Sequence, residues 1–187
     1  MEYHPNYFQF SRSSQAGKVL LEWWASLPTD SGGRAMLRRA DSPLAVAFCP
    51  VYQRLYARLR EAGMPELSDV YKDRLAAAIG LLAHVREDVM MSKDEERTSS
   101  SYSENTLPHL ATLMSASQKD ERNPISELRF RRLLESPDNQ ALFVGLRRAL
   151  PLMGYRANVI VLANDVLGWG ERVKKNWAYS YRWAEKN

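Results

Sequence analysis

Apolar side chains recur along this chain three and four positions apart, which is the spacing of one face of an α-helix. No stretch alternates between apolar and polar residues for long enough to predict a strand. Capping residues, prolines and glycines bound most of the helical segments. We predict helices at 14–27, 34–40, 50–62, 68–85, 106–116, 126–136, 138–150 and 158–181. The expected fold class is all-α, a compact multi-helix bundle whose N-terminal and C-terminal helical halves pack together.

A polar segment and an N-terminal extension divide the chain into regions. Residues 92–105 contain almost no apolar side chain to offset the entropy lost on ordering, so we predict a mobile polar loop there. We expect a flexible extension at 1–13, before an N-terminal helical half at 14–91. A C-terminal basic helical half covers 106–187. A chain of 187 residues can bury one core, so we expect one domain overall.

Charge distinguishes the two ends of the chain. Residues 1–124 hold 15 Lys and Arg against 16 Asp and Glu, whereas residues 125–187 hold 11 against 6. The formal net charge of +4 therefore comes from the last third. Such asymmetry indicates a polyanionic partner such as nucleic acid, although a merely solvated basic face has the same signature.

In the last third, the basic residues leave the apolar sides of their helices. In SELRFRRLLES, Phe130 and Leu133 share one side of the helical wheel. Arg129 and Arg132 fan across the opposite side. Leu128 lies among the arginines, which indicates a second contact surface there. The pattern predicts a helix with one buried face and one cationic face.

The two helices that follow show the same separation. Arg147 and Arg148 lie off the packed side of the helix at 138–150. In the last helix, Arg172 and Lys175 occupy the charged side and Lys174 lies nearer the apolar seam. Cationic faces on rigid helices are typical of proteins that hold a phosphate backbone.

Glycine and tryptophan patterns mark the last helix further. Gly168 and Gly170 each cost about 1 kcal/mol relative to alanine inside a helix, so they imply close helix packing or a kink at Trp169. The tryptophans have the spacing of core residues: Trp23, Trp24, Trp169, Trp177 and Trp183. Trp183, near the end, is the best placed of them for stacking on a ligand, but packing is the favoured role.

Candidate catalytic and metal-ligating residues do not cluster. His4, His84 and His109 lie in unrelated segments, and Cys49 is the single cysteine. This spacing lacks the pattern of a metal site and favours buried or solvated structural roles. The acidic run at 94–96 lies in the polar loop, without the scaffold that a nuclease needs. We therefore expect no enzyme activity, no metal and no cofactor.

The expected compartment is the cytoplasm. Charges break the longest apolar stretches within about ten residues, whereas a membrane span needs roughly twenty. The opening MEYHPNYFQF lacks the basic and apolar regions of a signal peptide. A single cysteine excludes an intramolecular disulfide. We expect no membrane partner.

Five motifs in order resemble a known family. They are WW near the N-terminus, LRRA, SELRFRRLL, LRRAL, and a helix ending W-x-x-x-V-K-K-x-W-A-x-x-Y. Each alone is weak, but their order is similar to that of the small subunit of the type I-E CRISPR surveillance complex Cascade, the CasB family. The resemblance covers residues 17–183, which is nearly the whole chain.

The resemblance implies an all-helical subunit without enzymatic activity, present in two copies along the belly of an RNA-guided complex. Such a subunit contacts the backbone subunits that bear the crRNA, the large subunit and a second copy of itself. It also lines the path of the target and displaced DNA strands. The family pattern implies that eight positions face nucleic acid: Arg38, Arg39, Arg129, Arg132, Arg148, Arg172, Lys174 and Lys175.

The helical wheel adds Arg34 and Arg147 to these candidate nucleic-acid-binding residues. A sharper prediction concerns one arginine from each of four helices: Arg39, Arg129, Arg148 and Arg172. All four leave the apolar sides of their helices. We therefore predict that the fold gathers at least three of them into one continuous cationic surface.

A physical role follows from the energetics of the R-loop, in which guide RNA displaces one DNA strand. Exchanging a DNA duplex for an RNA–DNA hybrid is nearly balanced in free energy, so modest backbone contacts can tip it. Arginine suits such contacts because its guanidinium bridges phosphate oxygens and stacks on bases. Since no base readout is needed, we expect sequence-independent binding that stabilises the R-loop in antiviral defence.

Two other functions fit the same residues. A stand-alone helical DNA-binding regulator would insert the helix of Arg129 or of Arg148 into a major groove, with residues 136–138 as the turn of a helix-turn-helix. A helical scaffold protein would use its basic faces to meet acidic proteins. A regulator would discriminate its operator from other DNA, whereas the Cascade subunit would bind any sequence with steep salt dependence.

Overall fold

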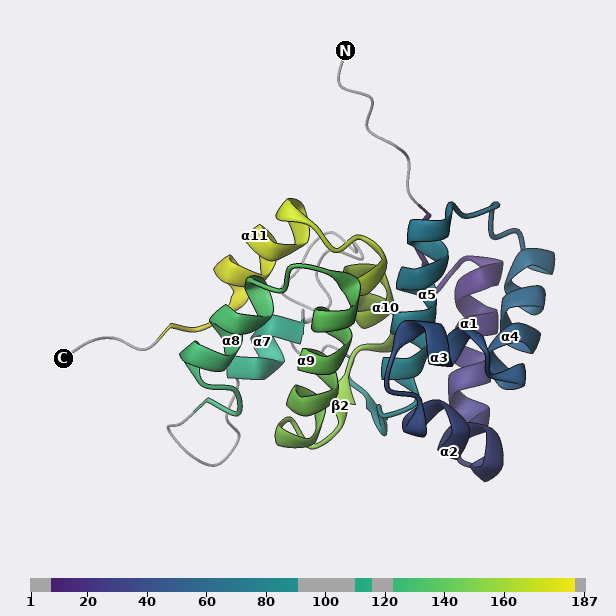
Figure 1. Cartoon of the computed structure of the whole chain (residues 1–187), viewed down its shortest axis with the longest axis horizontal. Helices are drawn as coiled ribbons and strands as arrows, with labels where there is room; N and C mark the ends of the chain where they lie inside the picture. The colour runs from purple at the N-terminus through teal and green to yellow at the C-terminus, as the bar shows by residue number, and fades with distance from the viewer. Residues whose placement is uncertain (1–7, 91–109, 116–122, 184–187) are drawn as a thin grey trace, which may run out of the picture.

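The computed structural model describes residues 8–90, 110–115 and 123–183 (Figure 1). Its elements in chain order are α1 (Gln15–Ser26), α2 (Ser31–Arg39), α3 (Pro43–Ala47), α4 (Pro50–Glu61), α5 (Asp69–Leu82), β1 (Glu87–Asp88), α7 (Leu110–Ser115), α8 (Glu127–Leu134), α9 (Asn139–Leu152), β2 (Arg156–Ala157), α10 (Val159–Leu167) and α11 (Glu171–Ser180). The all-α class is confirmed. Within the described ranges, β structure is limited to β1 and β2, a parallel pair of two-residue strands.

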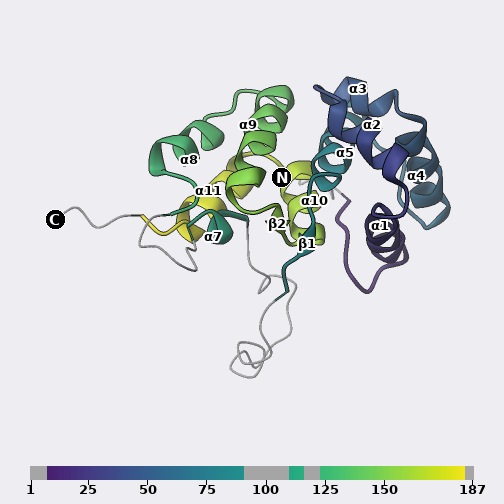
Figure 2. The same cartoon turned by 90° about the horizontal axis from the view of Figure 1, so that it is seen from below.

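The two helical halves pack together as predicted. In Figures 1 and 2, α1 to α5 form one half and α7 to α11 form the other. The halves meet where α5 packs against α10 and α9, and where α3 also contacts α9. The core therefore runs continuously from one half into the other.

The central helix α5 is apolar on every side in its second half, which is the pattern of a helix enclosed by others. Its residues from Leu75 to Leu82 are all buried. A Cβ atom at Gly80 would lie 2.6 Å from Val46 and 2.9 Å from the ring of Phe143, so glycine lets α3 and α9 approach closely. This close approach joins the halves.

A short helix that sequence reasoning missed, α3, lies between the helices predicted at 34–40 and 50–62. The Ser42 hydroxyl accepts a hydrogen bond from the Ala45 amide at 3.1 Å, and Pro43 occupies the first turn of α3. The same Ser-Pro pair that ends one helix therefore starts the next.

Residues 8–13 differ from the flexible extension expected at 1–13. Phe10 is fully buried, and its backbone amide and carbonyl both bond to the side chain of Asn164 at 2.8 Å. Arg12 forms an ion pair with Asp88. Residues 8–13 are thus held against α10 and β1, whereas residues 1–7 of the expected extension lie outside the described residues.

The long helix predicted at 158–181 is divided into α10 and α11 by the residues from Gly168 to Gly170. Trp169 between them is buried and packs edge-to-face on Trp177, with ring centroids 4.9 Å apart. The Trp177 indole donates to Asp165 at 2.7 Å. The kink considered at Trp169 is therefore a full break that inserts one indole into the core.

Some expectations fall on parts of the chain that are not described. The polar loop at 92–105 and residues 106–109 of the weaker helix lie outside the described residues. The part of that helix that is described forms α7. Among the helices that the structure describes, none is long and apolar enough to cross a membrane.

Candidate nucleic-acid interface

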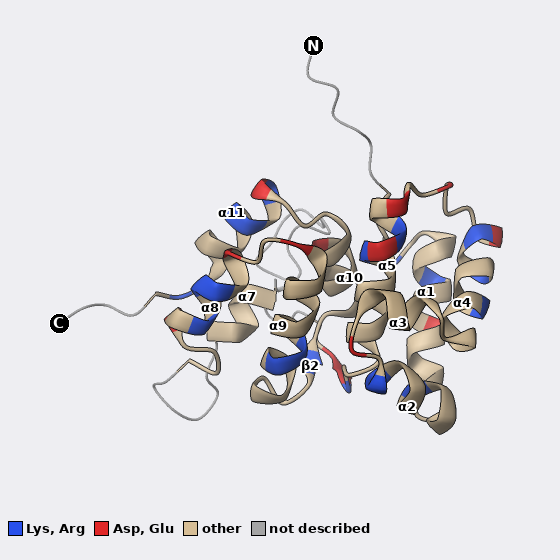
Figure 3. Cartoon of the chain, in the orientation of Figure 1, with Lys and Arg blue, Asp and Glu red and all other residues tan. Residues whose placement is uncertain are grey.

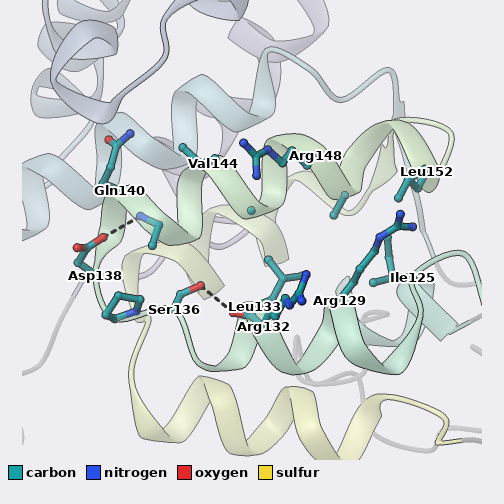
Figure 4. A pocket seen from close by; sticks show the side chains of 14 residues that line it. Ile125, Arg129, Arg132, Leu133, Ser136, Asp138, Gln140, Val144, Arg148 and Leu152 are labelled. Atoms are coloured by element: carbon teal, nitrogen blue, oxygen red, sulfur yellow. Dashed lines mark hydrogen bonds between the residues drawn. The ribbon is translucent and has the colours of Figure 1, made fainter.

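Helices α8 and α9 enclose a groove of about 790 Å³ (Figure 4). Figure 4 shows Arg129 and Arg132 on α8 and Arg148 on the facing helix α9. Apolar and small residues line the groove between them, among them Ile125, Leu133, Val144, Gly145, Ala149 and Leu152. Three predicted site residues therefore surround one hollow, which we call the α8–α9 groove.

The buried face of α8 decides where its arginines lie. Phe130 is fully buried and stacks on Tyr181, with ring centroids 4.0 Å apart and planes within 10° of parallel. This contact fixes the rotation of α8 about its axis. Arg129 and Arg132 are consequently exposed beside the groove, as the wheel predicted.

Close packing keeps the two walls of the groove together. A Cβ atom at Gly145 would lie 2.6 Å from Cδ2 of Leu133, so any larger residue at position 145 of α9 would crowd this side chain of α8. Glycine at this position lets the two helices approach closely. Gly145 therefore contributes to the close packing of the two walls that carry Arg148 and the arginines of α8.

The electrostatic character of the groove is cationic. Within the described ranges, Arg129, Arg132 and Arg148 form no ion pair. Asp138 also lines the groove, but its carboxylate accepts a hydrogen bond from the Ala141 amide at 2.7 Å and so caps α9. The three guanidinium groups are free to bind an external anion.

A second group of arginines lies where the two halves meet, and we call it the arginine junction: Arg34 and Arg38 of α2, Arg86 before β1, and Arg147 of α9. Arg34 donates from Nε to the Ala83 carbonyl at 3.0 Å and from a terminal nitrogen to the Val85 carbonyl at 3.1 Å. Burial, followed by Arg38 and Arg86, lowers the pKa of Arg34.

Arg147 also uses its guanidinium within the chain. It donates to the Arg38 carbonyl at 3.1 Å and lies over the ring of Phe143, 5.5 Å from its centroid. Arg34 and Arg147 were expected to face nucleic acid. In the structure both hold the ends of neighbouring elements together, which is a role that helical wheels do not reveal.

The basic residues of α11 divide in the same way. Lys174 is half-buried, donates to the Ser136 carbonyl at 3.3 Å and lies 5.5 Å from the ring centroid of Trp169. It therefore ties α11 to the connection between α8 and α9. Arg172 and Lys175 are exposed on α11, and Arg39 is exposed at the end of α2.

The α8–α9 groove thus unites two of the four arginines of the sharper prediction, Arg129 and Arg148, with Arg132 as a third member. Arg39 and Arg172 lie on other helices, outside the lining of the groove. Figure 3 shows basic positions on α8, α9, α11 and α2. That at least three of these four arginines share one continuous cationic surface stays a prediction.

The end of the chain shows how Trp183 is held. Its ring meets Phe130 and Tyr181 edge-to-face, with centroids 5.6 and 5.1 Å away, and Arg131 lies 5.6 Å from its centroid. Trp183 nevertheless stays 39% exposed. Leu128 is also exposed, so the second contact surface expected there stays a prediction.

Sequence reasoning gave no function to two residues of this region, His84 and Arg86. His84 is partly buried next to Arg34, Arg38 and Arg147. Arg86 lies over the ring of Tyr155, 4.2 Å from its centroid. Their neighbours come from distant segments, so no spacing in the sequence could have identified them.

The described residues hold no group of three or more His, Cys, Asp or Glu that could bind a metal ion. Cys49 is buried, and burial raises the pKa of its thiol. His4, His109 and the acidic run at 94–96 lie outside the described residues.

Comparisons with known proteins agree with this architecture. The sequence model of the family described as CRISPR-associated protein Cse2 matches residues 33–181. The fold is similar to that of a chain in the crystal structure of E. coli Cascade bound to a PAM-containing double-stranded DNA target. That similarity has a TM-score of 0.57 at 20% sequence identity and covers 88% of this chain and 92% of the other. No curated protein sequence gives a significant match.

The family match includes α2 with its LRRA motif, both walls of the α8–α9 groove and α11. It therefore spans most of the candidate residues as well as most of the fold. The resemblance found in the order of five motifs agrees with this match, and the chain belongs to the CRISPR-associated protein Cse2 family.

Proposed function

We propose that this protein is a non-enzymatic small subunit of a type I-E CRISPR Cascade complex. In this role it binds the crRNA-guided target strand and the displaced DNA strand without sequence preference and stabilises the R-loop. Membership of the Cse2 family and the likeness to a chain of E. coli Cascade support the assignment to such a complex. A complex that acts on invading DNA works in the cytoplasm.

The observation that carries the nucleic-acid part of the proposal is the α8–α9 groove. Three exposed arginines from two helices surround one hollow without an acidic partner among the described residues. Guanidinium groups bridge phosphate oxygens, and each neutralised phosphate releases condensed counterions. Backbone contacts of this kind suffice to bias an R-loop, because duplex and hybrid are nearly equal in free energy.

Further partners follow from the same assignment. We propose contacts with the backbone subunits that carry crRNA, with the large subunit and with a second copy of this chain. Large apolar side chains remain exposed on several helices, including Leu44, Phe48, Leu128 and Tyr179. Side chains of this kind are suited to contacts between subunits.

The packing of α9 argues against the alternative function, a stand-alone DNA-binding regulator. A recognition helix must present one face to a DNA groove. Five residues of α9 are buried, and the helix is in contact with α3, α5 and α8. The turn expected at residues 136–138 is the connection between α8 and α9, and these two helices pack against each other.

The direct test replaces Arg129, Arg132 and Arg148 together by glutamine. Binding of single- and double-stranded DNA would be followed by fluorescence anisotropy over a range of salt concentrations. We expect the slope of log affinity against log salt to fall by about 2 for single strands, because each lost phosphate contact contributes about 0.7. In an assembled complex the same variant should retain the R-loop less well while assembling normally.

A matched control removes the same charge from the other half. Lys18, Arg54 and Arg58 are exposed on α1 and α4, and their replacement by glutamine should leave the salt slope near that of the parent. An equal loss in both triple variants would overturn the assignment to the groove. Strand cleavage that depends on a divalent metal and tracks the purified protein would overturn the non-enzymatic role.

A further inference from the structure

The arginine junction concentrates positive charge without a counter-charge. Arg34 donates to the carbonyls of Ala83 and Val85 on either side of His84, and Arg147 donates to the Arg38 carbonyl, so these arginines lie around His84. Arg38 also influences the ionisation of His84, and Arg86 influences that of Arg34. None of the four forms an ion pair with any described residue. Like charges held together destabilise the folded state, and a bound anion would remove that cost.

Most of this charge is held in place before any ligand arrives. Arg34 donates to two backbone carbonyls, Arg147 donates to the Arg38 carbonyl, and Arg86 lies over the ring of Tyr155. Groups fixed in this way lose little entropy when they bind. The Arg38 guanidinium, in contrast, has no hydrogen-bond partner among the described residues, so it can move to meet a ligand.

His84 supplies an unsatisfied polar atom in the same place. Its Nε2 is buried and has no hydrogen-bond partner in the described structure. Burial, then Arg147, Arg38 and Arg34, lower the pKa of His84 to about 4. The imidazole is therefore neutral near pH 7, and a neutral ring can donate from Nε2 to an anion. Buried polar atoms in proteins usually have a partner, so an acceptor that entered this place would satisfy Nε2.

We propose that His84, Arg34, Arg38 and Arg147 form a seat for one phosphodiester group of a bound nucleic-acid strand. The Nε2–H group of His84 donates to a phosphate oxygen, and the arginines neutralise the charge. Nε2 is buried, so a neighbouring side chain must move before a phosphate can reach it, and the Arg38 guanidinium is free to move and then contact the phosphate. This inference rests on the proposed nucleic-acid binding and goes beyond it by assigning contact to a neutral donor.

The position of the seat favours a nucleic-acid strand over a lone carboxylate. Arg147 and Arg148 are consecutive in α9, and Arg148 lines the α8–α9 groove. A strand whose phosphates meet the groove can therefore continue along α9 to the seat. A polymer with regularly spaced charges can occupy both places at once, and this joint occupation strengthens its binding.

The test follows the imidazole signals of the whole chain by NMR. A mixed-sequence single-stranded DNA should shift the His84 signals and raise its pKa by about one to three pH units, because a phosphate would then lie within a few ångströms. The charged groups that face His84 are Arg34 and Arg38 of α2 and Arg147 of α9. A strand of the same sequence with an uncharged methylphosphonate backbone should leave His84 unmoved.

Variants give an independent readout. His84→Leu removes the unpartnered nitrogen, so it should bind DNA about tenfold more weakly without loss of folding stability. His84→Gln restores a side-chain N–H and should recover part of the affinity. Arg38→Gln should reduce the salt slope of DNA binding, and Arg54→Gln on α4 is the control for loss of one exposed charge.

The outcomes separate the two proposals. DNA binding that leaves the His84 signals and pKa unchanged would overturn the seat alone. Polyglutamate that moves His84 as far as DNA does would overturn the choice of a phosphodiester. A parent protein that binds no DNA would overturn both proposals. If His84→Leu does not fold, the titration of the parent protein still decides between these results.

Discussion

The α8–α9 groove and the arginine junction hold charges of the same kind in different ways. In the groove, Arg129, Arg132 and Arg148 are exposed and rest on helices that other residues stabilise. In the junction, Arg34 and Arg147 are half-buried and donate to backbone carbonyls of neighbouring elements. We therefore expect substitutions of the groove arginines to leave the fold intact and substitutions of Arg34 or Arg147 to destabilise it.

The difference shows why a basic residue cannot be assigned to binding from its place on a helical wheel. A position off the apolar face can point to solvent or to the exposed carbonyls at the end of another helix. Arg34 points to such carbonyls: it donates to the Ala83 and Val85 carbonyls, which follow α5 and accept no hydrogen bond from a later turn of that helix. Matched substitutions in the groove and in the junction can show which arginines stabilise the fold and which bind DNA.

The largest effect is expected at Arg34. Arg34→Met keeps the apolar stem of the side chain but removes the donors to two carbonyls, so the free energy of unfolding should fall by about 2 kcal/mol. Arg129→Met in the groove should change stability by less than about 0.5 kcal/mol. Chemical denaturation of both variants checks the contrast. Equal destabilisation would remove the distinction between the two regions.

A pH series sharpens the comparison through His84. The pKa is about 4 in the folded protein and 6.5 as the ordinary value, so the unfolded state binds more protons between these values. Folding stability should therefore fall as pH drops from about 6.5 to about 4, by about 1 to 2 kcal/mol for a partly exposed ring. Denaturation at several pH values should show this loss in the parent and its absence in His84→Leu. The groove lacks a titrating group of this kind, so the triple glutamine variant should follow the parent.

Gly145→Ala tests the wall of the groove. The added Cβ would meet Leu133 at 2.6 Å, and overpacking should outweigh the helix preference of alanine by about 1 kcal/mol. Adding Leu133→Val should recover part of the loss, which a double-mutant cycle would reveal as coupling. DNA binding through the groove should weaken in Gly145→Ala while the His84 signals remain those of the parent. If the stability changes of the two single variants simply add in the double variant, then the contact between Gly145 and Leu133 does not control the packing of α8 against α9.

The smallest effect on stability is expected at Arg148. Arg148→Gln should leave the free energy of unfolding within about 0.5 kcal/mol of the parent. It should lower the salt slope for single-stranded DNA by about 0.7, the contribution of one phosphate contact. Salt titration monitored by anisotropy measures the change. A slope equal to that of the parent would remove Arg148 from the interface.

Prediction from the sequence succeeded where the information was local. The all-α class, the buried face of α8 and the exposure of Arg129 and Arg132 all follow from helical periodicity within a few turns. The local pattern gave no sign of how residues 8–13 are held, because Phe10 is buried and its backbone bonds to Asn164 far along the chain. It also gave one long helix where Gly168 and Gly170 allow a complete break.

The candidate site was predictable only in part. Motif order pointed to the Cse2 family, and helical wheels placed most of its cations outside the core. The wheels could not separate Arg148, which faces the groove, from Arg147, which binds the carbonyl of Arg38. Adjacent residues in a helix point about 100° apart, and their neighbours depend on which other helices surround them.

The sequence by itself determined which faces of each helix are apolar, because hydrophobic burial acts on a repeat of a few residues. It also determined that the net positive charge comes from the last third. Only the tertiary structure decided which charges meet. Arg34, Arg38, His84 and Arg147 become neighbours when α2, the end of α5 and α9 pack together, and electrostatic interactions depend on distance in space and on burial rather than on separation along the chain.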